Sequence, residues 1–361
     1  MRFQEIKQAL LEYEDLNQEK ETIISKISGM SADNEQEAQL LDRIYKILNS
    51  GQISQNIDNA FDIPLADENM ADKQKQQVRQ DMTRIISSLD SDYKTMKALL
   101  DRLENKGSIV DIGALAKPLN TFGNVFGDTI GAAAFIALSN YGVGKNQKGP
   151  GEYAFASLSN KIRLAAGEGD LEIDGIGKVE LKAAMSSSGG RIGYGGGSQK
   201  AKKNVIEKYA ERIPSVMQSM QGKGGSVGLT SFMTALNQDL PVSDQENQSI
   251  RRALMQELLR MDMEAYANPV ADLIATSEDI SQIELEYLKQ NFLWYKNRDD
   301  FDALLLVSIP NKKTAMIRNE NDLQAFRTSG HSNALGISIV PTQAGAGREQ
   351  WAQLTLNKAK I

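Results

Sequence analysis

Apolar and polar residues alternate along residues 169–184, in the stretch GDLEIDGIGKVELKAA. Two short runs with a period of two flank the dipeptide Asp174-Gly175, which is typical of a tight turn, so the pattern predicts a β-hairpin. Because successive side chains of a strand point to opposite faces, one face of this hairpin is apolar and is expected to pack on a core. The other face gathers charged side chains in a small area: Asp170, Glu172, Glu180 and Lys182.

A helical period runs through residues 1–108 and predicts a helical amino-terminal arm. One apolar face consists of Leu40, Leu41, Ile44, Ile47 and Leu48. A second set has alternating spacings of four and three, which defines a heptad seam: Met82, Ile86, Leu89, Tyr93, Met96, Leu100 and Leu103. Two arrangements satisfy this seam. Either the arm is an antiparallel helical hairpin that packs on itself, or it associates through the seam with a protein partner or a second copy.

The rest of the chain mixes helical and strand patterns. Glycine, alanine and asparagine dominate residues 109–149, which predicts a junction with one short helix near 132–138. A helix is expected over 150–166, because Pro150 lies near its start and Glu152 in its first turn. Beyond the hairpin, the pattern predicts a basic amphipathic helix over 200–220, helices over 247–296, and a short helix near 322–327 between strands. Those strands lie in FDALLLVSIP, ALGISIVP and WAQLTL.

These elements predict an α/β (α+β) fold in three parts. Residues 1–108 form the helical arm, and residues 109–149 form the Gly/Ala-rich junction. Residues 150–361 form an α/β domain with a mixed sheet and a helical insertion at about 225–300.

Composition removes several classes of chemistry. The 361 residues contain no cysteine and a single histidine, His331. The lack of cysteine excludes a disulfide framework, a thiol nucleophile and a thiolate zinc site. The single histidine strongly disfavours a serine triad, so carboxylate and lysine chemistry remain. His331 lies in the polar stretch TSGHSN, where we expect a loop residue without a catalytic role.

Charge is distributed unevenly, although the net charge is only -6. Residues 1–110 carry 14 Lys and Arg against 20 Asp and Glu, so the acidic excess lies in the arm. Seven basic side chains fall in residues 182–212, directly after the hairpin. No run of eighteen apolar residues occurs and the first twenty residues do not resemble a signal peptide, so we expect no membrane association and a cytoplasmic location.

The hairpin carries a recognisable motif. An aspartate is followed about ten residues later by Glu-x-Lys on the next strand, and an acidic residue lies on the preceding helix. This arrangement resembles the PD-(D/E)xK nuclease superfamily, with Asp170, Glu180 and Lys182 as the matching positions and Glu152 as the helix acid. Other acid-x-Lys triplets, such as Glu104 to Lys106, lie on predicted helices and lack this context.

The resemblance implies a restriction-endonuclease-like core and Mg²⁺ or Mn²⁺ as the metal. Asp170, Glu180 and the carbonyl oxygen of Leu181 would hold the ion, and Lys182 would orient or help deprotonate the attacking water. Glu172 is an alternative ligand. The remaining interpretation is a hairpin whose polar face is solvated and salt-bridged, with Glu152 a simple helix-start acid.

Three features depart from the superfamily pattern. Gly169 stands where the motif has proline, only one hairpin precedes the lysine strand where an additional strand is usual, and an insertion of about 80 residues follows the basic helix. The resemblance covers about residues 150–220.

Arg191, Lys200, Lys202 and Lys203 are the predicted phosphate contacts, because glycines in the same stretch allow close backbone approach. An ordinary solvated helix start would explain the same lysines. Together these features predict a magnesium-dependent nuclease acting on DNA. The alternative is a structural or assembly protein that uses a nuclease-like fold, because the acidic arm and glycine-rich middle resemble, in style, virion-associated proteins of large tailed phages. In that case the location is the host cytoplasm or the virion.

Overall fold

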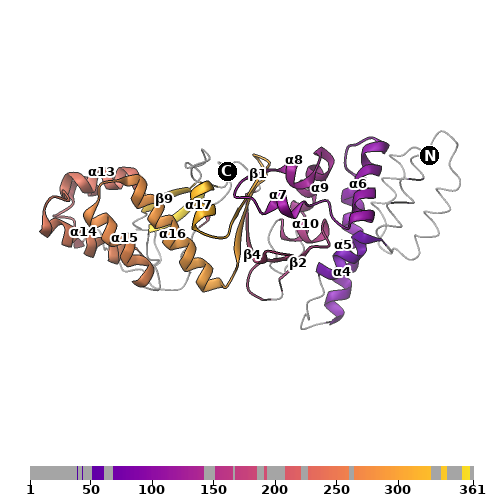
Figure 1. The fold of residues 1–361 in the computed structure, drawn as a ribbon, viewed down its shortest axis with the longest axis horizontal. Helices are drawn as coiled ribbons and strands as arrows, with labels where there is room; N and C mark the ends of the chain where they lie inside the picture. Colours follow the sequence, from indigo (N-terminus) through magenta and orange to yellow (C-terminus); the bar gives the residue numbers. More distant parts are fainter. Residues whose placement is uncertain are drawn as a thin grey trace. The chain divides into compact units, whose positions relative to one another are not determined.

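The chain forms two compact units in the computed structural model (Figure 1). The first unit comprises Met1–Met185 with Phe301–Ile317, and the second comprises Ser186–Asp300 with Arg318–Ile361. The structure describes residues 39, 43, 51–60, 68–141, 151–165, 167–184, 191–192, 208–220, 227–259, 264–326, 335–339 and 352–357. The boundaries expected at residues 108 and 149 do not coincide with this division, because arm, junction and hairpin all belong to the first unit.

A six-stranded mixed sheet forms the centre of the first unit, in the order β1-β8-β7-β4-β3-β2. Neighbouring strands are antiparallel except β4 and β7, which are parallel. The strands are β1 (Asn120–Thr121), β2 (Ile162–Leu164), β3 (Leu171–Ile173), β4 (Gly177–Ala184), β7 (Ala303–Ser308) and β8 (Lys313–Ile317). The mixture of helices and a mixed sheet confirms the predicted α/β (α+β) class.

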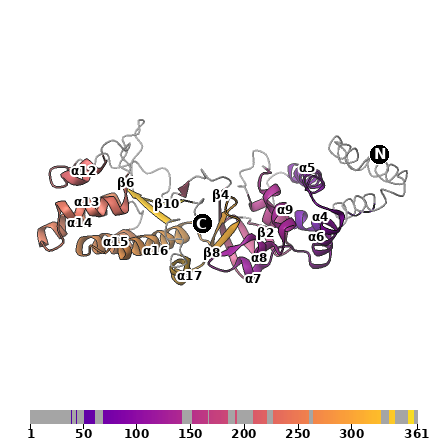
Figure 2. The ribbon, with the colours of Figure 1, turned by 90° about the horizontal axis from the view of Figure 1, so that it is seen from above.

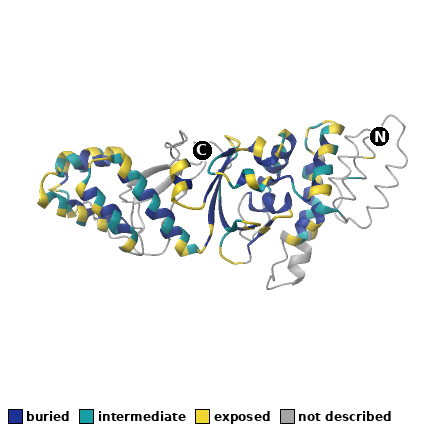
Figure 3. Ribbon diagram, viewed as in Figure 1, coloured by how far each residue is buried: buried dark blue, intermediate teal, exposed yellow. Residues whose placement is uncertain are grey.

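Helices of the first unit surround a phenylalanine cluster. The ring centroids of Phe126 and Phe135 are 4.5 Å apart, as are those of Phe135 and Phe155, and Phe122 lies 5.2 Å from Phe126. The same cluster of buried residues includes Leu171, Val179 and Leu305 of the sheet, and Figure 3 shows buried residues in both helices and strands of this unit. The helices are α4 (Gln52–Ala60), α5 (Glu68–Ser87), α6 (Tyr93–Lys106), α7 (Ile112–Leu115), α8 (Phe122–Phe126), α9 (Thr129–Ser139) and α10 (Glu152–Ser157).

The predicted heptad seam is part of this core. Asp92 caps α6 by accepting from the Thr95 N–H, so the seam is split between α5 and α6 instead of following one helix. Five seam residues are at most 3% exposed and belong to the same cluster as the phenylalanines: Met82, Ile86, Met96, Leu100 and Leu103. The interpretation of these five residues as a self-association surface is therefore wrong. The interpretation as a helical hairpin that packs only on itself is incomplete, because the seam also packs in the core with the phenylalanines.

Two other expectations of the first unit need correction. The stretch 109–149 is not a mere junction, since its phenylalanines build the core, although the expected short helix is confirmed as α9. The helix expected over 150–166 ends at Ser157, and residues 162–164 form β2 instead. Ile162 and Leu164 are buried while Arg163 is exposed, which is strand alternation in a segment too short to settle its period from sequence. β8 was not anticipated.

The second unit is mainly helical. α13 packs on β6 and β9, α14 on α15, and α15 on α16 (Figure 2). Its helices are α12 (Pro214–Met220), α13 (Leu229–Asp239), α14 (Gln245–Leu258), α15 (Glu264–Thr276), α16 (Ile280–Asp299) and α17 (Glu320–Phe326). Its antiparallel sheet has the order β5-β10-β9-β6, formed by β5 (Arg191–Ile192), β6 (Val227–Gly228), β9 (Leu335–Ile339) and β10 (Ala352–Asn357).

These elements confirm most of the later predictions. The helices over 247–296, the short helix near 322–327 and the three strands are all present. The basic helix expected over 200–220 is not continuous, because residues 209–212 form a turn before α12 begins at Pro214. Lys200, Lys202 and Lys203 lie outside the described residues.

Arg251 of α14 is fully buried and joins the ends of two other helices. Its guanidinium donates to the carbonyl oxygens of Ile274 and Leu240, both at 2.8 Å, and to Asn237 Oδ1 at 2.8 Å. Burial lowers the pKa of Arg251 to about 10. The partial negative charge at the carboxyl ends of α13 and α15 favours the cation there.

We expect Leu100→Ala to lower the free energy of unfolding by about 2 to 5 kcal/mol, because it opens a cavity in the core. The measurement is denaturant unfolding at several protein concentrations, with exposed Lys94→Ala of the same helix as the control. A seam that served as a subunit interface would instead give Leu100→Ala a lower molecular mass than the wild type and a concentration-dependent midpoint.

Arg251→Met should lower the free energy of unfolding by about 3 kcal/mol or more, because several buried oxygen acceptors lose their donor. The matched control is the next residue: Arg252 is half-exposed and pairs with Asp272, so Arg252→Met should cost less than about 1 kcal/mol. Equal losses in the two variants would contradict a special role for the buried guanidinium.

Candidate functional site

The predicted hairpin is confirmed, with β3 and β4 as its strands. Leu171 pairs with Val179 and Ile173 with Gly177, and the Ile176 N–H donates to the Ile173 carbonyl oxygen across the turn at 3.0 Å. The apolar side chains of both strands lie in the core cluster of the first unit. The charged side chains therefore occupy the opposite face of the sheet, as the alternation indicated.

The two strands separate at Gly169, immediately before Asp170. The Asp170 N–H still donates to the Val179 carbonyl oxygen at 3.0 Å, but Gly169 has a φ of +79° and turns the chain away. The N–H of Leu181 then donates to Asp170 Oδ2 at 2.8 Å. A side-chain carboxylate thus replaces the backbone acceptor that a continued strand would supply, and this bond fixes Asp170 against the centre of β4.

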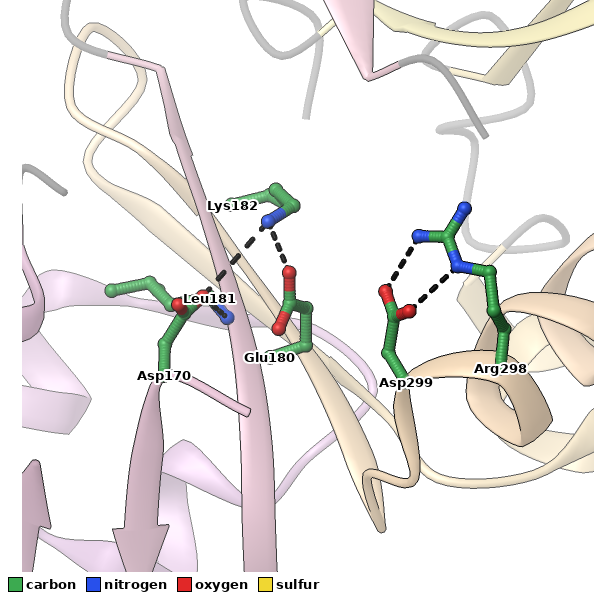
Figure 4. A network of polar contacts seen from close by, with 6 residues as sticks. All are labelled: Asp170, Glu180, Leu181, Lys182, Arg298 and Asp299. Carbon is green, nitrogen blue, oxygen red and sulfur yellow. Dashed lines mark hydrogen bonds and ion pairs between the residues drawn. The ribbon is translucent and has the colours of Figure 1, made fainter. Parts of the chain in front are cut away.

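Lys182 joins two carboxylates on this face (Figure 4). Its Nζ forms an ion pair with Glu180 Oε1 and lies 3.9 Å from Asp170 Oδ2. The Glu180 side chain is 11% exposed, whereas those of Asp170 and Lys182 are 24% and 29% exposed. Two carboxylates so near one ammonium define a position where positive charge is favourable. The structure therefore brings together Asp170, Glu180 and Lys182.

These groups suit a hard divalent ion in type and number. Mg²⁺ commonly uses only one or two protein carboxylates and completes its shell with water and substrate phosphate oxygens. Asp170 and Glu180 provide the two carboxylates, and Leu181, the residue after Glu180, donates its N–H to Asp170. Within the described part of the chain, no three His, Cys, Asp or Glu side chains form a group that could hold a metal.

Glu152 and Glu172 differ from this pair. Glu172 is exposed and stands opposite Lys178 in the register, nearer the turn of the hairpin. Glu152 is the first residue of α10 and is 5% exposed. A Cβ on the preceding Gly151 would contact the side chains of Leu181 and Ala183, on the core face of β4. Among the described residues, the centre thus consists of two carboxylates and a lysine, and no third acidic side chain joins them in a metal-binding group.

The predicted phosphate contacts are distributed differently. Arg191 lies in β5 of the second unit, and Lys200, Lys202 and Lys203 are outside the described residues. These four residues remain predictions.

Asp302 is a residue that sequence reasoning missed. Its Oδ2 accepts from the Lys178 N–H at 2.9 Å, and its own N–H donates to the Lys178 carbonyl oxygen at 2.8 Å. These two bonds join the starts of β4 and β7 and so set the register of the parallel pair. The two residues are 124 positions apart, and no local pattern connects them.

Comparison with models of known protein families, with curated proteins and with solved structures found no match. None of the helices in the described ranges combines the length and apolar character needed to cross a bilayer. Any function must therefore be argued from the geometry of the chain itself.

We expect Gly169→Ala to destabilise the first unit by about 1 to 2 kcal/mol, because an L-residue is strained at φ +79°. Gly167→Ala is the matched control, since a Cβ there meets nothing within 4 Å. Thermal or denaturant unfolding gives both values. If Gly169→Ala were as stable as Gly167→Ala, the turn before Asp170 would not depend on glycine.

Proposed function

We propose that this protein is a metal-dependent phosphodiester hydrolase that acts on DNA. The observation that carries the proposal is the convergence of Asp170, Glu180 and Lys182 on one face of a hairpin. The strand β2 adds support, because it precedes the hairpin and pairs with β3. The PD-(D/E)xK pattern usually has an additional strand before the lysine strand, and β2 supplies a strand at that place.

Each residue has a distinct chemical task in this proposal. Asp170 and Glu180 would hold Mg²⁺ or Mn²⁺, with the Leu181 carbonyl oxygen as the third protein ligand that the resemblance implies. The ion would supply Lewis-acid stabilisation of the phosphate and a more acidic bound water. With an ion held by the two carboxylates, the Lys182 ammonium would be available to orient the attacking water and to stabilise the negative charge that develops on the phosphate oxygens.

A structural or assembly role is the second candidate, and the pairing of Lys182 favours it. One ammonium already lies beside both carboxylates, so the polar face of the hairpin is satisfied without a metal or substrate. In that case the chain uses its nuclease-like sheet as a packing module, as a virion protein would. The two candidates differ in what they require of Lys182.

Plasmid cleavage separates them. The wild type should nick or linearise a plasmid in Mg²⁺ or Mn²⁺ and do neither in excess chelator. Lys182→Ala should lower the cleavage rate by about 100-fold or more, the contribution expected of a positioned proton-transfer group. The matched control is Lys178→Gln on the same strand and face, whose side chain pairs with Glu168 at 3.8 Å. This control should cut at the wild-type rate.

Metal binding supplies a readout that is independent of turnover. Removing the Lys182 ammonium leaves Asp170 and Glu180 without its compensating charge, so Mg²⁺ should raise the melting temperature of Lys182→Ala at least as much as that of the wild type. Cleavage by Lys182→Ala at the wild-type rate would refute the nuclease proposal. Absence of cleavage by the wild type in both metals would favour the structural role.

A further inference from the structure

Three lysines lie along the edge of the six-stranded sheet formed by β8 and β1. Lys312 and Lys313 form the end of the β7–β8 turn and the start of β8, and Lys117 precedes β1. The backbone fixes all three: Thr121 pairs with Lys313, the Phe122 N–H donates to Lys312 O at 2.8 Å, and the Met316 N–H donates to Lys117 O at 3.1 Å. We call Lys117, Lys312 and Lys313 the basic edge.

The register places Lys313 of this edge on the face that carries the candidate centre. Lys182 pairs with Leu306 of β7, and two residues further along β7, Ser308 pairs with Lys313 of β8. Paired residues of neighbouring strands share a face, and so do residues two apart within a strand. Lys313 therefore lies on the same face as Glu180 and Lys182.

The basic edge carries positive charge that is not neutralised locally. Residues 112–127 and 303–317 contain all three lysines and no aspartate or glutamate. Among the residues that the structure describes, none forms an ion pair or hydrogen bond with the ammonium groups of these lysines. Lys117 and Lys312 are exposed, and Lys313 is partly exposed. The hairpin differs, because the charged groups of Lys178 and Lys182 have carboxylate partners.

The separation fits a polymer with regularly spaced negative charges. Lys313 lies two strands across and two residues along from Lys182, which is about 12 Å for strand spacings of about 4.8 Å and a rise of about 3.3 Å. That distance corresponds to about three to four nucleotides of axial rise along one strand of DNA. The separation of the two positions is therefore one that a single DNA strand can span.

We infer that the basic edge binds the phosphate backbone of DNA next to the candidate centre. The inference rests on the proposed nuclease function for its choice of ligand. Lysines neutralise phosphates without reading sequence, so the edge contributes affinity and positions the scissile bond. Neighbouring amides and hydroxyls, those of Asn311 and Thr121, are groups that commonly add contacts to phosphate oxygens.

The test is a salt titration of binding to a short fluorescein-labelled DNA duplex, with calcium in place of magnesium to prevent turnover. Lys312→Gln/Lys313→Gln should reduce the slope of log affinity against log salt by about two units, and adding Lys117→Gln should reduce it by about one more. The control is Lys94→Gln/Lys106→Gln, which removes the same charge from exposed positions of α6. Its slope should equal that of the wild type.

Several outcomes would overturn the inference. The first is an equal salt slope for Lys312→Gln/Lys313→Gln and for the control variant. The second is no binding of the duplex by the wild type at low salt. The third is that Lys312→Gln/Lys313→Gln loses as much affinity for polyglutamate as for DNA, which would assign the edge to acidic polypeptides. Failure of the proposed function gives a different result. The wild type would then not cleave plasmid, while the slope of log affinity against log salt would still fall only in the basic-edge variant. A basic edge that binds DNA without cleavage would then stand alone.

Discussion

The parallel pairing of β4 with β7 is the interaction on which the first unit depends. It joins the hairpin sheet β2–β3–β4 to β7, β8 and β1, and it aligns six residue pairs from Val179–Ala303 to Ala184–Ser308. Such distant strands meet only at a cost in chain entropy, which the burial of all six residues of β7 offsets. The same pairing gives the sheet its two faces. One closes the phenylalanine core, and the other carries Glu180, Lys182 and Lys313.

Local patterns predicted much of this arrangement. The alternation around Asp174-Gly175 was sufficient for the hairpin, because strand periodicity and turn chemistry both act over a few residues. The apolar run ALLLV predicted β7, a buried strand of the kind that parallel pairing requires. From these elements the fold class and the meeting of Asp170, Glu180 and Lys182 followed. The long-range partner of β4 did not, because Asp302 and Lys178 meet only through tertiary structure.

The wrong predictions share a physical cause. A heptad seam and a helix that packs inside a domain present the same apolar stripe, so Met82 to Leu103 could not reveal what covers them. Residues 162–164 and 313–317 are strands too short for a period to be measured, and pairing with neighbours decides their conformation. Gly169 looked like a departure from the superfamily motif. With φ at +79°, however, this backbone position excludes proline, whose ring holds φ near -65°.

Lys182 decides whether the charged face of the hairpin is a structural feature or a reactive one. With the ammonium beside Asp170 and Glu180, the three groups sum to one negative charge in a partly buried place, which stabilises the hairpin. A divalent ion between the same carboxylates would reverse that sign and repel the ammonium, so the long lysine stem must carry it toward solvent. The Lys182 side chain is 29% exposed, so part of it already borders solvent. Asp170 is held by the Leu181 N–H, whereas the Lys182 ammonium sits at the end of a longer side chain with more rotatable bonds. Under the proposed function, a centre arranged in this way would exchange its ammonium for the metal ion while the strand pairing of β4 stays unchanged.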